Sequence, residues 1–214
     1  MSSTNRGGRR EPSDYYVTPL PTIRAFLKAW MRDVGLGTLT GLSILDPCAG
    51  GDAAHPMSYP TVLQEYGACP EDIFTVDIRE DSRAMIHADY LGVEFPLAGF
   101  VPDIAVSNPP FSLAGEFIRK ALRDVAPGGW VVFLLRLNVY GGWDRYSRLW
   151  PEVGLPKLAY AHPYRIGFRP EEPRKTDSIE YMHACWRQGE RCESTVLRLA
   201  NDYAELPPSE RRKG

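Results

Sequence analysis

The chain has 214 residues, of which 43% are hydrophobic and 24% are charged, and these values are typical of one globular domain with a sizeable core. The formal net charge of −2 excludes a general attraction to nucleic acid, so any such binding requires a local basic face. Since no apolar run is long enough to cross a bilayer and residues 1–13 lack the hydrophobic centre of a signal peptide, we expect a cytoplasmic protein with no membrane partner.

The two ends of the chain differ in composition from its middle. Residues 1–13 are rich in Ser, Gly and Arg, which predicts a disordered basic tail that either contacts phosphates or only aids solubility. Residues 14–200 form the predicted domain, and residues 201–214 should fray as a C-terminal tail. No cysteine stands in a Cys-x-x-Cys pair or near a histidine at zinc-finger spacing, so we expect free thiols and no metal site from Cys48, Cys69, Cys185 and Cys192.

The first predicted helix spans residues 21–33, and its apolar face repeats at helical spacing through Ile23, Phe26, Leu27 and Trp30. A short extended segment, Tyr15-Tyr-Val-Thr-Pro19, precedes this helix. Thr18 either contacts a ligand or caps the helix, and Tyr16 either lines a site or only packs.

A short buried strand is predicted over residues 43–45, and it ends at Asp46 before a turn of small residues, Pro47-Cys-Ala-Gly-Gly-Asp52. Glycines at such a turn let the backbone approach a ligand closely, and an acidic side chain there can bind the ammonium group of an amino acid. The turn lacks the Gly-x-Gly-x-x-Gly of a nicotinamide site and the Gly-Lys-Ser/Thr of a phosphate loop. Beyond it, His55 is expected to be a turn residue rather than a metal ligand, and a helix should follow over residues 59–66.

A second strand is predicted over residues 73–77, and it ends in Asp77, 31 residues after Asp46. A carboxylate at this strand tip can accept both hydroxyls of a ribose, although an aspartate here can also simply begin a turn. Residues 84–87 then lead to Asp89, twelve residues after Asp77.

The stretch Asp103-Ile-Ala-Val-Ser-Asn-Pro-Pro-Phe111 carries the strongest chemical signal in the sequence. Residues 104–106 predict a buried parallel strand, which must stop before the two prolines because neither has an N–H to donate. At this strand end, the Asn108 side-chain oxygen and the Pro109 carbonyl can hold the hydrogens of an aromatic amine, and its lone pair is then free for attack. The ring of Phe111 can stack on the same aromatic group, in a geometry that the prolines keep rigid.

Asn108-Pro-Pro-Phe111 resembles the catalytic motif of S-adenosylmethionine-dependent amino methyltransferases, and its Asn…Phe form is most similar to that of the adenine-N6 DNA enzymes. Thr18-Pro19 resembles the motif that lines the methionine end of the cofactor. Residues 46–51 resemble the Asp-Pro-x-x-Gly-x-Gly loop of the family, with Asp52 in place of the last glycine. Asp89 resembles the acid that accepts the adenine amine of the cofactor, next to an apolar residue that covers the ring.

This resemblance covers roughly residues 14–187 and implies S-adenosylmethionine as the cofactor. It also implies an α/β class I methyltransferase (Rossmann-like) fold, a seven-stranded mixed sheet with a C-terminal β-hairpin and helices on both faces. The residues expected to bind the cofactor are Tyr16, Thr18, Pro19, Asp46, Pro47, Gly50, Gly51, Asp77, Ile78, Asp89, Tyr90 and Asn108. The residues expected to act in catalysis are Asn108, Pro109, Pro110 and Phe111.

The rest of the chain completes the predicted sheet. A helix that Ser112 caps should run to about residue 125, and a buried strand should follow over residues 130–135. Strands over residues 157–166 and 178–187 should enclose a hairpin similar to the one that distinguishes the methyltransferase sheet from a dinucleotide-binding sheet. Within it, the run Thr176-Asp-Ser-Ile-Glu-Tyr181 is similar to the closing strand of small phage-type adenine methyltransferases.

Two segments after residue 111 combine aromatic and basic side chains in a way that suits a nucleic acid. For residues 138–150 ordinary packing against the sheet explains the pattern equally well, and for residues 167–177 a solvated hairpin tip does. The residues expected to bind nucleic acid are Tyr140, Trp143, Arg145, Arg165, Arg169, Arg174 and Lys175.

The sequence therefore predicts direct methyl transfer to the exocyclic N6 amine of an adenine that is flipped out of DNA, without a covalent intermediate. Double- or single-stranded DNA is the expected partner. The alternatives are adenine in RNA, a glutamine amide in a protein, and an inactive DNA-binding module, which Asp52 in the glycine loop would favour. Because we expect no room for a separate recognition domain, target recognition should be short or loose, or come from residues 138–150 and 167–177 or from a partner subunit.

Overall fold

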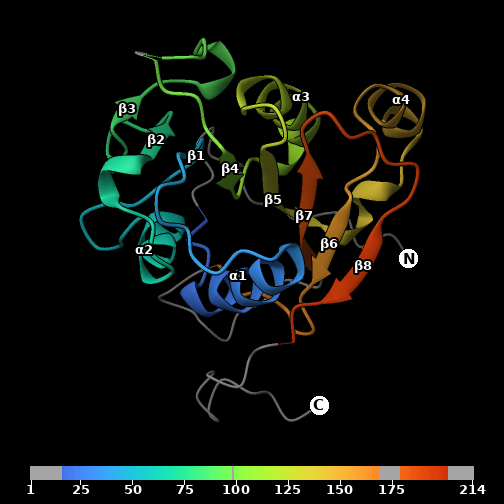
Figure 1. The fold of residues 1–214 in the computed structure, drawn as a ribbon, viewed down its shortest axis with the longest axis horizontal. Coiled ribbons are helices and arrows are strands. Elements are labelled where there is room, and N and C mark those ends of the chain that lie inside the picture. The colour runs from blue at the N-terminus through green and yellow to red at the C-terminus, as the bar shows by residue number, and fades with distance from the viewer. Residues whose placement is uncertain (1–15, 98, 169–178, 202–214) are drawn as a thin grey trace, which may run out of the picture.

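The computed structural model describes residues 16–97, 99–168 and 179–201. Within them an eight-stranded sheet crosses the molecule in the order β3-β2-β1-β4-β5-β7-β6-β8 (Figure 1). Its strands are β1 (Ile44–Asp46), β2 (Ile73–Asp77), β3 (Ile86–His87), β4 (Ile104–Ser107), β5 (Trp130–Arg136), β6 (Leu158–Ala161), β7 (Tyr181–Arg187) and β8 (Val196–Leu199). Strand β7 runs antiparallel to β5 and β6, and the other pairs are parallel. The predicted mixed sheet is confirmed, and β8 adds a strand that was not predicted.

Helices cover both faces of this sheet, as expected. Buried side chains of α1 and α2 share one core cluster, whereas buried side chains of α3 belong to the cluster of the opposite face, against which partly buried side chains of α4 pack. These helices are α1 (Leu20–Val34), α2 (Ser58–Glu65), α3 (Ala114–Asp124) and α4 (Trp150–Val153). Shorter turns of 3₁₀-helix occupy Pro70–Asp72, Tyr90–Gly92, Phe111–Leu113 and Leu137–Tyr140, and a π-helical turn occupies Arg145–Leu149. Among the described residues, no helix is both long and apolar enough to cross a bilayer.

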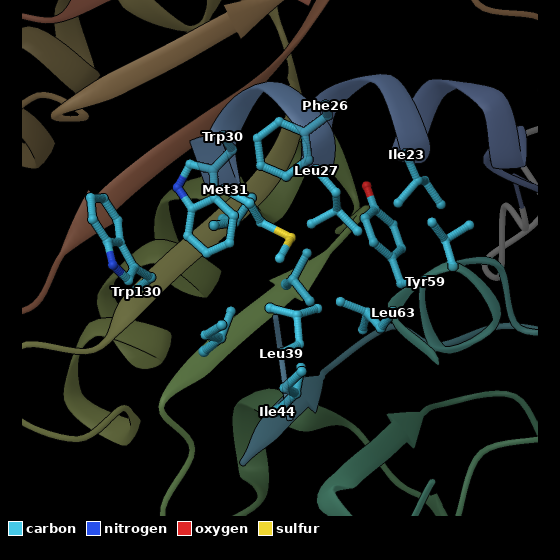
Figure 2. Packing of buried hydrophobic residues seen from close by; sticks show 14 of the residues in the cluster. Ile23, Phe26, Leu27, Trp30, Met31, Leu39, Ile44, Tyr59, Leu63 and Trp130 are labelled. Atoms are coloured by element: carbon cyan, nitrogen blue, oxygen red, sulfur yellow. The ribbon is translucent and has the colours of Figure 1, made fainter. Parts of the chain in front are cut away.

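Alternate side chains of the central strands fill the two cores, which explains why these strands are apolar throughout. In β5, Trp130 and Val132 belong to the cluster of α1, and Val131 and Phe133 belong to the cluster of α3. Both sets of side chains in β7 are buried as well. Figure 2 shows the first cluster, in which the side chains of α1 face those of α2 and the central strands: Ile23, Phe26, Leu27, Trp30, Met31, Tyr59, Leu63 and Trp130.

Two predicted boundaries are wrong for local reasons. Strand β6 ends at Ala161 instead of residue 166, because Pro163 cannot donate to the ladder. Ser112 does not cap α3, since it lies inside the 3₁₀ turn that precedes the helix and the N-cap residue, Leu113, makes no side-chain hydrogen bond. The start of β7 is found at Tyr181, and residue 178, where it was predicted to begin, lies outside the described residues.

Candidate active site

A cavity of about 640 Å³ opens where β1, β2, β4 and β5 end. Its wall consists largely of the segments that follow these strands, residues 47–50, 77–79, 108–114 and 135–139. The order of the sheet reverses between β1 and β4, and such a reversal is where open α/β sheets bind ligands at the carboxyl ends of their strands.

Most of the residues predicted for the cofactor and for catalysis line this cavity. They are Tyr16, Thr18, Pro47, Gly50, Asp77, Ile78, Asp89, Tyr90, Asn108, Pro109, Pro110 and Phe111. Three predicted residues, Pro19, Asp46 and Gly51, are not part of its wall.

Thr18 fixes the orientation of the Asn108 amide. The Asn108 Nδ2 donates to Thr18 Oγ1 at 3.1 Å, and the Thr18 side chain is buried. Asn108 Oδ1 is also buried, and among the described residues it has no hydrogen-bond partner. Because the N-cap of α1 is Pro19, which makes no side-chain bond, Thr18 does not act as the helix cap that the sequence left open. The contact with Thr18 therefore fixes the amide of a residue that lines the cavity and leaves its oxygen without a partner.

Phe111 is surrounded by side chains from distant parts of the chain. The Arg136 guanidinium lies over its ring, with Cζ 4.8 Å from the centroid, and the Tyr181 ring lies 5.5 Å away. Phe168 packs on Tyr181 at 5.0 Å and on Tyr16 at 5.7 Å. An aromatic cluster with one cation therefore stands beside Asn108, where the sequence predicted only Phe111.

Asp77 ties the glycine loop to the end of β2. Its Oδ2 accepts from the Gly50 N–H at 2.8 Å, and its Oδ1 accepts from the Arg79 N–H at 2.9 Å. Gly50 has a φ of 63°, which glycine adopts without strain, and it lines the cavity next to Asp77. Each carboxylate oxygen keeps a second lone pair for a ligand.

Asp46 lies at the end of β1, fully buried behind the cavity wall. Its Oδ1 accepts from Ser107 Oγ at 2.6 Å and from the Cys48 N–H at 3.2 Å, but its Oδ2 has no partner among the described residues. Burial raises the pKa of Asp46 to about 7, and the nearby Asp77 carboxylate acts in the same direction. This carboxyl group is therefore only partly ionised near neutral pH.

Asp52, which replaces the last glycine of the family loop, closes a turn that is not part of the cavity wall. Its Oδ1 accepts from the Ala54 N–H at 2.7 Å and from the His55 N–H at 2.8 Å. The His55 ring contacts the same carboxylate at 3.1 Å, so His55 is a turn residue, as predicted. Asp52 therefore lies outside the cavity wall, to which the loop contributes residues 47–50.

Asp89 and Tyr90 also line the cavity. Asp89 Oδ1 accepts from the Leu91 N–H at 3.0 Å and begins a 3₁₀ turn. The Tyr90 hydroxyl donates to Asp124 Oδ2 at 2.6 Å, and the Lys120 Nζ lies 4.8 Å from the centre of its ring. Burial, and then the Asp124 carboxylate, raise the pKa of Tyr90 well above its usual value, so the ring is a neutral, fixed surface.

The residues predicted for nucleic acid are dispersed. Arg145 lines the cavity, whereas Trp143 near it in the chain is 78% exposed and packs against Tyr146 in a tilted arrangement with centroids 5.6 Å apart. Tyr140 is partly buried and lies outside the wall, and Arg165 pairs loosely with Glu180 at 3.9 Å. Arg169, Arg174 and Lys175 lie outside the described residues.

Several residues of the wall were not predicted, and the most polar of them are Tyr59, Arg79, Arg136 and Asn138. Arg79 comes just after β2, and Arg136 is the last residue of β5. The rule that parallel strands end at the same sheet edge would have found both of these arginines.

No family model matches the sequence, and neither does any curated protein. Solved structures match the fold. A candidate class I S-adenosylmethionine-dependent methyltransferase from Listeria monocytogenes is 15% identical with a TM-score of 0.58, over 90% of this chain and 68% of its own. A candidate RNA methyltransferase from Pyrococcus horikoshii is 15% identical with a TM-score of 0.57, over 85% and 92%. A chain of a type I restriction-modification system is 11% identical with a TM-score of 0.58, and the match spans 85% of this chain but 44% of that one. The chain therefore has the class I methyltransferase fold.

Proposed function

We propose that this chain transfers a methyl group from S-adenosylmethionine to the N6 amine of adenine in DNA. The observation that carries the proposal is made at Asn108: this residue lines the cavity, its amide nitrogen donates to Thr18, and its buried Oδ1 lacks a partner among the described residues. A buried acceptor without a partner destabilises a protein by about 1–3 kcal/mol. An amine hydrogen of the target would satisfy it.

The residues present suit the cofactor. The cavity volume of about 640 Å³ lies within the usual range of ligand pockets, about 300–1,000 Å³. Asp77 has spare lone pairs for the ribose hydroxyls, and Asp89 can accept the adenine amine while Tyr90 covers the ring. Asp46 is fully buried behind the glycine loop and outside the cavity wall, so its proposed effect on an ammonium group of the cofactor would act through the loop.

When bound, S-adenosylmethionine would supply a methyl group whose carbon–sulfur bond breaks as a nitrogen–carbon bond forms, which leaves a thioether; the methylated amine then releases one proton to solvent water. Asn108 Oδ1 and the Pro109 carbonyl accept the two hydrogens of the amine. This draws the nitrogen toward a pyramidal geometry and frees its lone pair. The two prolines fix both acceptors in advance, and such preorganised positioning is a major source of catalysis.

DNA is the proposed substrate for two reasons. One neighbour is a chain of a type I restriction-modification system, and Arg145, which lines the cavity, comes two residues after the exposed Trp143. An adenine within DNA must leave its stack to reach Asn108, and aromatic and basic side chains suit the strand that remains. We include Tyr140, Arg165, Arg169, Arg174 and Lys175 in this proposed contact, and a partner subunit would extend it. RNA is the second candidate, because another neighbour is described as an RNA methyltransferase.

The test is transfer of a tritiated methyl group from S-adenosylmethionine to double-stranded DNA, single-stranded DNA, total RNA and a protein lysate in parallel. We expect label in DNA that is recovered as N6-methyladenine, and no label with Asn108→Ala. Label confined to RNA or to protein would overturn the substrate and keep the reaction. Label in none of the four would overturn the proposed activity.

A further inference from the structure

The cavity contains a contact that the proposed function does not use. The planar guanidinium of Arg136 lies over the ring of Phe111, 4.8 Å from its centre, and both side chains line the cavity. Phe111 is also the ring on which the target base is proposed to stack. A base that stacked on the face of Phe111 that the guanidinium covers would have to displace the guanidinium.

The hold on Arg136 is weak. Its Nε is buried and has no hydrogen-bond partner among the described residues, although a guanidinium offers its donors in a fork that matches a phosphate or a carboxylate. A cation over an aromatic ring is a modest interaction, and it can be exchanged for stacking by a base. A flipped nucleotide brings both a base for Phe111 and phosphates for the guanidinium.

We propose that Arg136 is a placeholder for the target base. In the free protein its guanidinium covers Phe111, and on binding the base takes that position while the guanidinium moves to a phosphate of the same strand. The inference rests on the proposed function. It assigns to Arg136 a role in positioning the target, and it explains how a chain with a net charge of −2 places a cation where a backbone must pass.

The two halves of this proposal predict opposite changes for two ligands. The protein is first saturated with S-adenosylhomocysteine, so that neither ligand enters the cofactor site, and is then titrated with 2′-deoxyadenosine or with a single-stranded oligodeoxyadenylate. Arg136→Ala should bind 2′-deoxyadenosine about two- to fivefold more tightly, because no cation has to leave Phe111. The same variant should bind the oligonucleotide about tenfold more weakly, and the slope of log affinity against log salt should fall by about 0.7.

Arg187→Ala is the matched control, because the Arg187 guanidinium also lies over an aromatic ring, that of Trp130 at 5.0 Å, but outside this cavity. It should change neither affinity. Arg136→Lys should retain the salt slope, since it keeps the charge.

If Arg136→Ala bound both ligands more weakly, Arg136 would be only part of the cavity wall. If it changed neither affinity, Arg136 would have no role in binding the target. Either result would overturn the proposal. If the two affinities shifted in opposite directions but the protein transferred no methyl group, the role of Arg136 would stand and the proposed function would be rejected. A wild-type protein that binds neither ligand would reject both.

Discussion

The proposed cofactor side and the proposed target side of the cavity wall are built differently. On the cofactor side, the wall carboxylates of Asp77 and Asp89 already accept backbone N–H groups from the loops around them, and the unpartnered Oδ2 of Asp46 lies behind this wall. On the target side, Asn108 Oδ1 and Arg136 Nε are buried without a partner among the described residues. The first arrangement fixes the shape of the wall before any ligand arrives. The second leaves specific polar atoms without a hydrogen-bond partner, which a ligand would supply.

This difference connects the stability of the protein with its function. Polar atoms that hold a loop in place contribute to folding, whereas buried atoms without a partner reduce stability until a ligand binds. Substitutions on the two sides should therefore have different effects. Those on the target side should affect transfer, and those on the cofactor side should affect cofactor affinity.

Asn108→Ala should have the largest effect. It removes one of the two acceptors that activate the amine, and such groups typically contribute about 10²–10⁴-fold to the rate. We expect a loss of that size in kcat, with the dissociation constant for S-adenosylmethionine changed by no more than about twofold. Single-turnover transfer and calorimetric titration measure the two quantities.

The matched control is Asn138→Ala, which removes an asparagine from the same cavity wall outside the motif. It should leave the rate within about threefold of the wild type. Equal losses of transfer and of cofactor affinity in Asn108→Ala would contradict the separation of the two sides.

Asp46→Asn should stabilise the free protein at high pH. The pKa of Asp46 is raised from 3.8 to about 7 in the folded protein, so its favourable contribution is complete below pH 3.8 and is lost as the pH rises through 7. That loss amounts to about 4 kcal/mol, and a neutral amide avoids it. Urea unfolding should show a gain of up to about 4 kcal/mol at pH 8 that shrinks toward zero at pH 4.

Asp52→Asn is the control for this pH effect. Burial alone would raise the pKa of Asp52, but the hydrogen bonds from His55 and Ala54 lower it below its ordinary value. Asparagine at residue 52 should therefore bring no gain at pH 8. If Asp46→Asn gave the same gain at pH 4 and pH 8, ionisation of Asp46 would not be its cause.

The sequence predicted the bounds of β2 correctly, but it missed β8 at the edge of the sheet and made the neighbouring β6 too long. The bounds of β2 agree with the prediction because its apolar run stops at an aspartate that begins a turn. Strand β8 was missed because it is short and all four of its residues, Val196–Leu199, are exposed, so no buried pattern marks it. Strand β6 was predicted too long because the apolar pattern continues past Pro163, which ends the ladder.

For the candidate site, the sequence predicted most of the residues that line one cavity but not their contacts. Short motifs identified Asn108, Asp77 and Gly50, since each follows a predicted strand. The contacts of Asn108 with Thr18 and of Phe111 with Arg136 join separate elements, and only the folded sheet brings them together. Tertiary contacts of this kind leave no periodic signal in the sequence.

Asp77→Ala should weaken the binding of S-adenosylmethionine by about 10–100-fold, because it removes the proposed ribose acceptors and releases the Gly50 N–H. At saturating cofactor the rate of transfer should recover to within about threefold of the wild type. Glu71→Ala is the control, because this carboxylate is exposed and lies outside the cavity wall. An Asp77 variant with normal cofactor affinity would rule out the ribose role.

Thr18→Val should have the smallest effect and tests how Asn108 is held. Valine has nearly the same shape as threonine, so it fills the buried site but cannot accept the Asn108 Nδ2–H. The amide is then free to rotate, and its oxygen points at the target for only part of the time. We expect kcat to fall about three- to tenfold with cofactor affinity unchanged. Thr18→Ser keeps the hydroxyl and should restore most of the rate. If serine and valine reduced kcat equally, the methyl group of Thr18 would matter through packing, and the hydrogen bond would not orient Asn108.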